Sequence, residues 1–269
     1  MSDLLGSESC GSACPCGAIT AESLSLHYGS TPAFRDLSVE IPRCEITALI
    51  GPSGCGKTSF LSSINRLTDL VPNCEVQGRL QVEDLDVLSP SLDVVALRKR
   101  VGMIFQKPNP FAFSIAKNLA LPLREHGVRD RDEIERRSRA ALEDVGLWDE
   151  VRDRLRNDAR DLSGGQQQRL CLARALVLEP EVLLLDEPCS ALDPIASATV
   201  EDHLISLRGR FTVVIVTHNL AQARRVADRV VVMWPGEAGG QIVEEGPTEI
   251  VFEHSEAEIT RSYIQGLRG

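Results

Sequence analysis

The sequence lacks long apolar segments and a positive net charge, and it does not start like a secretory signal. Its apolar runs are short, such as residues 182–185 and 213–216, whereas a membrane-spanning helix needs roughly 20 consecutive apolar residues. Its 29 Lys and Arg residues are outnumbered by 39 Asp and Glu residues, for a formal net charge of −10. We therefore expect a chain that neither crosses a membrane by itself nor coats nucleic acid through a basic surface.

The first residues also argue against secretion. Residues 1–17 have neither the basic start nor the apolar core of a signal, and we expect residues 1–18 to form a disordered leader. Cys10, Cys14 and Cys16 lie close together there, but a tetrahedral metal site needs four ligands, so a reduced tail is favoured over a metal site. In so long a chain, the eight cysteines favour free thiols in a reducing cytoplasm over a disulfide framework.

The sequence does contain enough apolar residues for a sizeable core. Its 269 residues are 43% hydrophobic and 25% charged, which suits one large domain or two small ones. Alternating apolar residues predict strands between residues 19 and 50. Further along, we predict helices over 165–178, 195–208 and 219–226, and strands over 182–186, 212–216 and 229–233. This alternation implies a mainly parallel sheet covered by helices on both faces.

The stretch from about 110 to 162 is different, because it is dense in Arg, Asp and Glu. Within it, Ile134, Ala141, Val145 and Trp148 fall on one face of a predicted helix. Mixed charges around such a face indicate a solvated helical surface rather than a nucleic-acid patch. We expect a helical block inserted into an α/β domain.

A glycine-rich loop carries the strongest chemical signal. Residues 51–58 match G-x-x-x-x-G-K-[ST] in full, after an apolar strand and before a helix predicted over 57–67. Glycines let backbone N–H groups point at phosphate oxygens, and the helix N-terminus adds a partial positive charge. Lys57 is expected to reach the β- and γ-phosphates, and the Thr58 hydroxyl to ligate Mg²⁺. The candidate nucleotide-binding residues here are Gly51, Pro52, Ser53, Gly54, Cys55, Gly56, Lys57, Thr58 and Ser59.

Cys55 adds an expectation of its own. A thiol beside Lys57 at a helix N-terminus is expected to react with maleimides and to be protected by ATP.

Two carboxylates follow the apolar run 182–185. Ligands of α/β sheets collect at the carboxyl ends of strands, so Asp186 is expected to hold Mg²⁺ and Glu187 to activate the attacking water. Two acids at a strand end are a weak signal alone and a strong one beside a complete phosphate loop.

A third motif comprises Ser163, Gly164, Gly165 and Gln166. Ser163 is a good helix N-cap, and the glycines expose backbone N–H groups, so this is a second candidate anion site. A simple kinase has no need of two phosphate cradles.

In this order, the three motifs resemble the ATP-binding cassette (ABC) ATPases over nearly all of residues 19–269. The resemblance implies an α/β P-loop fold with a mainly parallel sheet core, an antiparallel N-terminal part and a helical subdomain at about 110–162. It further implies that Tyr28 stacks on adenine, Gln106 contacts Mg²⁺ and water, Asp193 lies in a dimer-interface loop and His218 touches the γ-phosphate. Cys189 departs from the threonine usual there.

Four segments are similar to one branch, the ATP-binding subunits of bacterial phosphate importers: residues 65–70, 102–111, 147–155 and 162–169. This likeness implies ATP with Mg²⁺, a homodimer in which Ser163–Gln166 acts in trans, and no nucleic acid. It also implies two membrane-spanning permease subunits, a phosphate-binding protein as indirect partner, and a place on the cytoplasmic face of the inner membrane.

Two other classes remain as alternatives. A soluble ABC ATPase of DNA repair would carry a long coiled coil, and residues 58–162 show no sustained heptads; translation types generally carry two cassettes. A small-molecule P-loop kinase has no use for the third motif.

Overall fold

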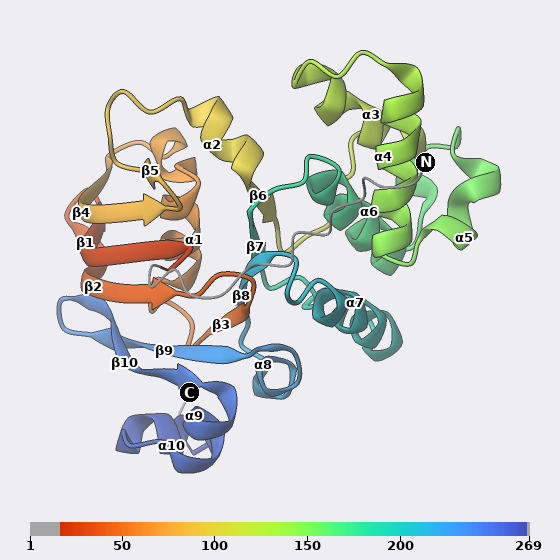
Figure 1. Cartoon of the computed structure of the whole chain (residues 1–269). Coiled ribbons are helices and arrows are strands. Elements are labelled where there is room, and N and C mark those ends of the chain that lie inside the picture. Colours follow the sequence, from red (N-terminus) through yellow and green to blue (C-terminus); the bar gives the residue numbers. More distant parts are fainter. Residues whose placement is uncertain (1–16, 268–269) are drawn as a thin grey trace, which may run out of the picture.

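Ten strands form a single sheet in the part of the chain that this computed structural model describes, residues 17–267 (Figure 1). In chain order the strands are β1 (Ile19–Tyr28), β2 (Thr31–Ile41), β3 (Ile46–Ile50), β4 (Cys74–Val82), β5 (Leu85–Asp86), β6 (Val101–Ile104), β7 (Val182–Asp186), β8 (Thr212–Val216), β9 (Arg229–Gly236) and β10 (Gly239–Pro247). Their order across the sheet is β5-β4-β1-β2-β10-β9-β3-β8-β7-β6.

Helices alternate with the strands along most of the described chain. The α-helices are α1 (Lys57–Ile64), α2 (Val94–Arg100), α3 (Ile115–Glu125), α4 (Arg131–Asp144), α5 (Trp148–Val151), α6 (Gly164–Leu176), α7 (Pro194–Ser206), α8 (Leu220–Val226), α9 (Thr248–His254) and α10 (Glu258–Ile264). The 3-10 helices are η1 (Leu67–Leu70), η2 (Arg152–Arg154) and η3 (Ala159–Asp161). Among residues 17–267, no helix is both long and apolar enough to span a bilayer.

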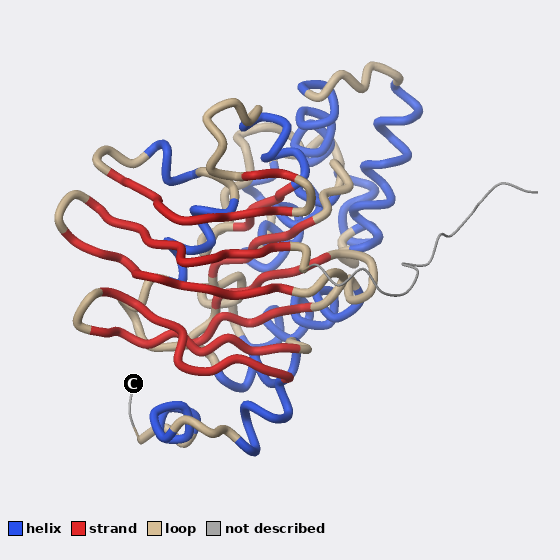
Figure 2. The backbone as a smooth tube through the Cα atoms, turned by 60° about the vertical axis from the view of Figure 1, so that its left-hand side comes forward, coloured by secondary structure: helices blue, strands red, loops and turns tan. Residues whose placement is uncertain are grey.

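The sheet has a parallel core and an antiparallel part. Strands β9, β3, β8, β7 and β6 run parallel to one another, and β1, β2, β4 and β5 pair antiparallel. Strand β10 joins the two parts, because it pairs antiparallel with β9 and parallel with β2. Figure 2 shows the strands stacked as one curved sheet with helices behind it. The fold class predicted from the sequence is confirmed, including the strands at 182–186 and 212–216.

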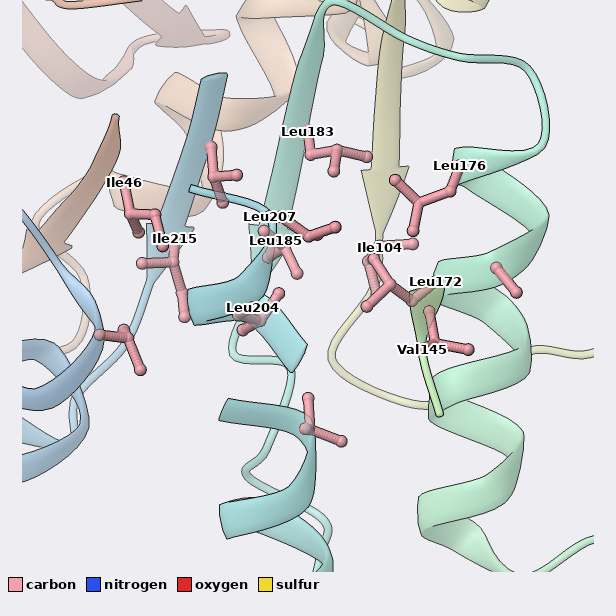
Figure 3. Close-up of a cluster of buried hydrophobic side chains, with 14 of the residues drawn as sticks. Ile46, Ile104, Val145, Leu172, Leu176, Leu183, Leu185, Leu204, Leu207 and Ile215 are labelled. Atoms are coloured by element: carbon pink, nitrogen blue, oxygen red, sulfur yellow. The ribbon is translucent and has the colours of Figure 1, made fainter. Parts of the chain in front are cut away.

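Burial of both faces explains why the parallel strands are continuous apolar runs. Leu183 and Leu185 of β7 belong to one buried cluster, while Val182 and Leu184 belong to a second one on the other face. Figure 3 shows the first cluster, where side chains from the strands lie beside Leu172 of α6 and other helical residues. Such a strand cannot alternate apolar and polar residues, because neither face meets water.

The region between β6 and β7 is helical, and it extends away from the antiparallel strands in Figure 1. The continuous helical face predicted from Ile134 to Trp148 is wrong in one respect, because α4 ends at Asp144 and Trp148 begins the short helix α5. Gly146 intervenes with a positive φ of 59°, a conformation that ends a helix and favours glycine.

Only the last two residues of the leader expected over 1–18 are described by the structure. Its residues 1–16, with Cys10, Cys14 and Cys16, lie outside the described residues. Ala18 is buried, and its N–H donates to the carbonyl of Ile41, 2.8 Å away.

Candidate functional site

The glycine-rich loop connects β3 to α1 and is fitted closely against β9. Gly51 has a φ of +141°, and a Cβ there would lie 1.9 Å from the carbonyl oxygen of Met233. Only glycine can occupy this position, because any side chain would collide with backbone. The first residue of the loop is therefore packed directly against the backbone of β9.

Lys57 closes over this loop. Its ammonium donates to the carbonyls of Gly51 and Pro52 at 2.7 and 2.8 Å, and the side chain is only 7% exposed. These two carbonyl oxygens accept hydrogen bonds from the same N–H groups of the Lys57 ammonium that would otherwise donate to phosphate oxygens. The first turn of α1 also holds Ser59, whose Oγ accepts a hydrogen bond from the Tyr28 hydroxyl at 3.3 Å. The end of β1 thus lies beside the phosphate loop.

The expected reactivity of Cys55 is wrong. Its side chain is 0% exposed, and its sulfur lies 3.4 Å from the Lys57 ammonium. A reagent cannot reach a thiol that is covered by its own loop.

Thr58 and Asp186 meet at the carboxyl end of the parallel core. The Thr58 hydroxyl donates to Asp186 Oδ1 at 3.0 Å. Burial raises the pKa of Asp186, as does the neighbouring charge of Glu187, and Thr58 and Lys57 act in the opposite direction. A hydroxyl and a carboxylate oxygen are the hard ligands that Mg²⁺ prefers, and Mg²⁺ usually takes its remaining ligands from water and phosphate. The residues present therefore fit a Mg²⁺ bound with a nucleotide, although no three His, Cys, Asp or Glu side chains within residues 17–267 could hold a metal ion by themselves.

Glu187 lies at the centre of a second group of side chains. Its backbone is left-handed, with a φ of 47°, and its N–H donates to the carbonyl of Val216 at 2.9 Å. Gln106 Nε2 donates to Glu187 Oε2 at 2.9 Å, and His218 Nδ1 lies 3.0 Å from Oε1. The three residues follow the ends of β6, β7 and β8, which are neighbours in the sheet. Sheet topology therefore brings together three residues that are distant in sequence.

The third motif begins α6 with a capping box. Ser163 accepts a hydrogen bond from the Gln166 N–H, and the Gln166 side chain accepts one from the Ser163 N–H at 3.0 Å. A Cβ on Gly165 would lie 2.9 Å from the Cβ of Ala196 in α7, so this turn packs against the helix that Asp193 caps. Figure 1 shows α6 well apart from α1, with β6 and β7 between them. Within one chain, the helix that the third motif begins is therefore separate from the helix that follows the phosphate loop.

Glu150 was not recognised as a functional candidate from the sequence. Its carboxylate accepts a hydrogen bond from Gln166 Nε2 at 2.6 Å and pairs with Arg169 at 2.8 Å. Burial would raise the pKa of Glu150, but the bonds from Gln166 and Arg169 outweigh it and hold the pKa below its usual range. Glu150 therefore fixes the amide of the third motif. No spacing rule links residues 16 positions apart across a turn, so only the structure identifies this contact.

Cys189, the departure from the usual threonine, is half-buried beside α7. Its sulfur lies 4.0 Å from the carbonyl of Ser197, and burial raises the pKa of the thiol to about 11. The side chain is therefore a neutral thiol at physiological pH.

A glycine-rich phosphate loop and an acidic strand end on the parallel core of the sheet, with a second glycine motif at the start of α6, define a nucleotide-binding ATPase of the cassette class. The family model described as "ABC transporter" matches residues 34–190, more than half of the chain. The chain belongs to the ABC transporter family and is one of its ATP-binding ATPases.

Individual relatives are more specific. The chain is 56% identical over 255 residues to "Phosphate import ATP-binding protein PstB 1" of Nitrosococcus oceani, covering 95% of this chain and 92% of that protein. It is 50% identical over 254 residues to PstB 2 of Shouchella clausii, covering 93% and 91%. Among solved structures, cbiO1 of Clostridium perfringens, part of the ABC transporter complex cbiONQ, matches with a TM-score of 0.75 and 27% identity, covering 90% of this chain and 92% of that one. These relatives are transporter components, and nothing in them favours a soluble ATPase.

Proposed function

We propose that this chain is the ATP-hydrolysing subunit of an importer of inorganic phosphate. The observation that carries the proposal is the identity of 46–56% to proteins named for phosphate import, over 93–95% of the chain. The chain would lie on the cytoplasmic face of the inner membrane, attached to two permease subunits that receive phosphate from a binding protein. The imported phosphate would not contact this chain, and no nucleic acid would take part.

The phosphate loop and Tyr28 would bind ATP. Tyr28 would stack on the adenine, and the backbone N–H groups of residues 51–59 would bind the phosphates. Lys57 would exchange the carbonyls of Gly51 and Pro52 for β- and γ-phosphate oxygens, which are charged and therefore better acceptors.

Thr58, Asp186 and Gln106 would hold Mg²⁺ beside the phosphates. When bound, the ion supplies charge neutralisation that favours attack on the γ-phosphate. Asp186 suits this role because its carboxylate is half-buried next to Glu187, and a cation there would offset the two neighbouring acids.

Glu187 would accept the proton of the attacking water. Gln106 and His218 already contact its two oxygens, so they would orient the carboxylate, and His218 would also touch the γ-phosphate. A residue held from two sides needs little reorganisation to act as a base.

The third motif would act on the nucleotide of a second copy. Because α6 lies apart from α1 within one chain, Ser163–Gln166 would reach the γ-phosphate only across a head-to-tail homodimer, with Asp193 at its interface. ATP binding would close the dimer, and hydrolysis would reopen it and drive the permeases.

A reconstituted complex tests this function. The chain is co-expressed with candidate permease subunits, purified with them and placed in vesicles with ATP inside and phosphate with its binding protein outside. We expect ATP-dependent uptake of phosphate, no uptake of sulfate in a parallel assay, and no uptake with Lys57→Ala. ATP hydrolysis without phosphate uptake, or failure to co-purify with any membrane subunit, would contradict the proposal.

A further inference from the structure

Glu201 is a buried carboxylate with no part in the functions described so far. It lies in the middle of α7, is only 7% exposed, and borders a cavity of about 400 Å³ that also borders Glu187 and His218. A buried carboxylate is costly unless its oxygens are paired, so its partners identify what it holds in place.

Both partners of Glu201 lie on α8. Gln222 Nε2 donates to Glu201 Oε1 at 3.1 Å, and Arg225 donates to Oε2 at 2.5 Å. Gln222 is itself buried. One carboxylate therefore fastens α8 to α7 through both of its oxygens.

The start of α8 is connected directly to His218. Asn219 follows His218 and caps α8, accepting a hydrogen bond from the N–H of Gln222 at 3.1 Å. The Asn219 N–H in turn donates to Thr217 Oγ1 at 3.0 Å. Because α8 is short and capped in this way, its position determines where His218 lies.

The other end of the connection returns to Glu187. The Ser197 hydroxyl of α7 donates to the carbonyl of Cys189 at 3.5 Å, two residues after Glu187. The contacts therefore close a ring from Glu187 to His218, through α8 to Glu201 and α7, and back through Cys189, around the cavity.

We propose that Glu201 is a positioning residue that holds His218 against Glu187 by fixing α8 on α7. The inference rests on the roles proposed above for His218 and Glu187. Because Asp193 is the N-cap of α7, the same carboxylate also sets the distance between the proposed interface loop and His218.

The test compares two adjacent acids on the same helix. Glu201→Gln replaces the carboxylate by an amide whose NH₂ cannot accept from Arg225, and Asp202→Asn removes the charge of the exposed residue that pairs with the same guanidinium. We expect Glu201→Gln to lower kcat for ATP hydrolysis by about 2- to 30-fold, a range typical of residues that act through others, with the KM for ATP unchanged. Asp202→Asn should behave as wild type.

A second background separates positioning from general damage. In His218→Ala, single-turnover hydrolysis should fall no further when Glu201→Gln is added, because its effect passes through His218. An equal loss in both backgrounds, or an unchanged kcat in Glu201→Gln, would overturn the inference. If Glu201→Gln does not fold, Gln222→Leu replaces it, since that variant keeps the ion pair with Arg225. A His218→Ala variant with wild-type activity would instead contradict the proposed function.

Discussion

Replacing Glu187 by glutamine isolates the proposed chemical step from nucleotide binding. In the structure Glu187 Oε2 accepts from Gln106 and Oε1 faces His218 Nδ1. The amide oxygen can still accept from Gln106, and its NH₂ can donate to a neutral His218, so the fold should persist. What is lost is the basicity, which for a general base is worth about 10²- to 10⁴-fold, or about 3 to 5 kcal/mol of barrier.

Nucleotide affinity should not fall with the rate. Glu187→Gln removes a negative charge next to the proposed γ-phosphate site, and that charge already raises the pKa of Asp186. We therefore expect ATP to bind at least as tightly as to wild type, while single-turnover hydrolysis, followed by rapid quench, slows by the factor above. Glu237→Gln makes the same chemical change on an exposed turn and serves as the control. Wild-type hydrolysis by Glu187→Gln, or weakened binding of ATP, would refute the reasoning.

Three further predictions concern the phosphate loop, the half-buried acid Asp186 and the dimer. Lys57→Ala should lose hydrolysis and weaken ATP binding in a titration, with an unchanged circular dichroism spectrum; retained hydrolysis would contradict the loop assignment. Burial raises the pKa of Asp186 above its value in the unfolded chain, so ionisation of this carboxyl lowers the stability of the fold as the pH rises above that unfolded-state pKa. Asp186→Asn should therefore melt at a higher temperature than wild type at pH 8, and this difference should vanish below about pH 4. In sedimentation, Glu187→Gln should become a dimer only when ATP is added, and an unchanged mass with ATP would count against the dimer. Adding Glu150→Ala, which frees the side-chain amide of Gln166, should weaken this dimer without weakening ATP binding.

The parallel core was the most predictable part of the fold. Residues 182–185 and 213–216 are unbroken apolar runs because both faces of β7 and β8 are buried, and the strand bounds 182–186 and 212–216 match the prediction. Strand β4 was not predicted, because it lies near the edge of the sheet and most of its side chains are at least partly exposed. The break between α4 and α5 was missed because apolar residues continue the helical spacing across Gly146.

The candidate site divides in the same way. Motifs that are contiguous in sequence identify Lys57, Asp186 and Glu187, because each carries its chemistry in a local pattern. Glu150 and Glu201 could not be found in this way, since each acts on a residue in another helix and their acidic side chains look like ordinary surface charge. The burial of Cys55 could not be predicted from the sequence either, because it depends on how the loop folds back over its own thiol.

The left-handed backbone of Glu187 has a consequence for any attempt to engineer this protein for heat resistance. A non-glycine residue held at such a φ costs of order 1 to 3 kcal/mol, and glycine would relieve most of that cost. A library selected only for survival of heating would therefore enrich glycine at position 187 and discard the proposed base in the process. Screens on this scaffold need a turnover assay at every round, because thermal stability favours glycine at position 187 whereas the proposed catalysis requires glutamate there.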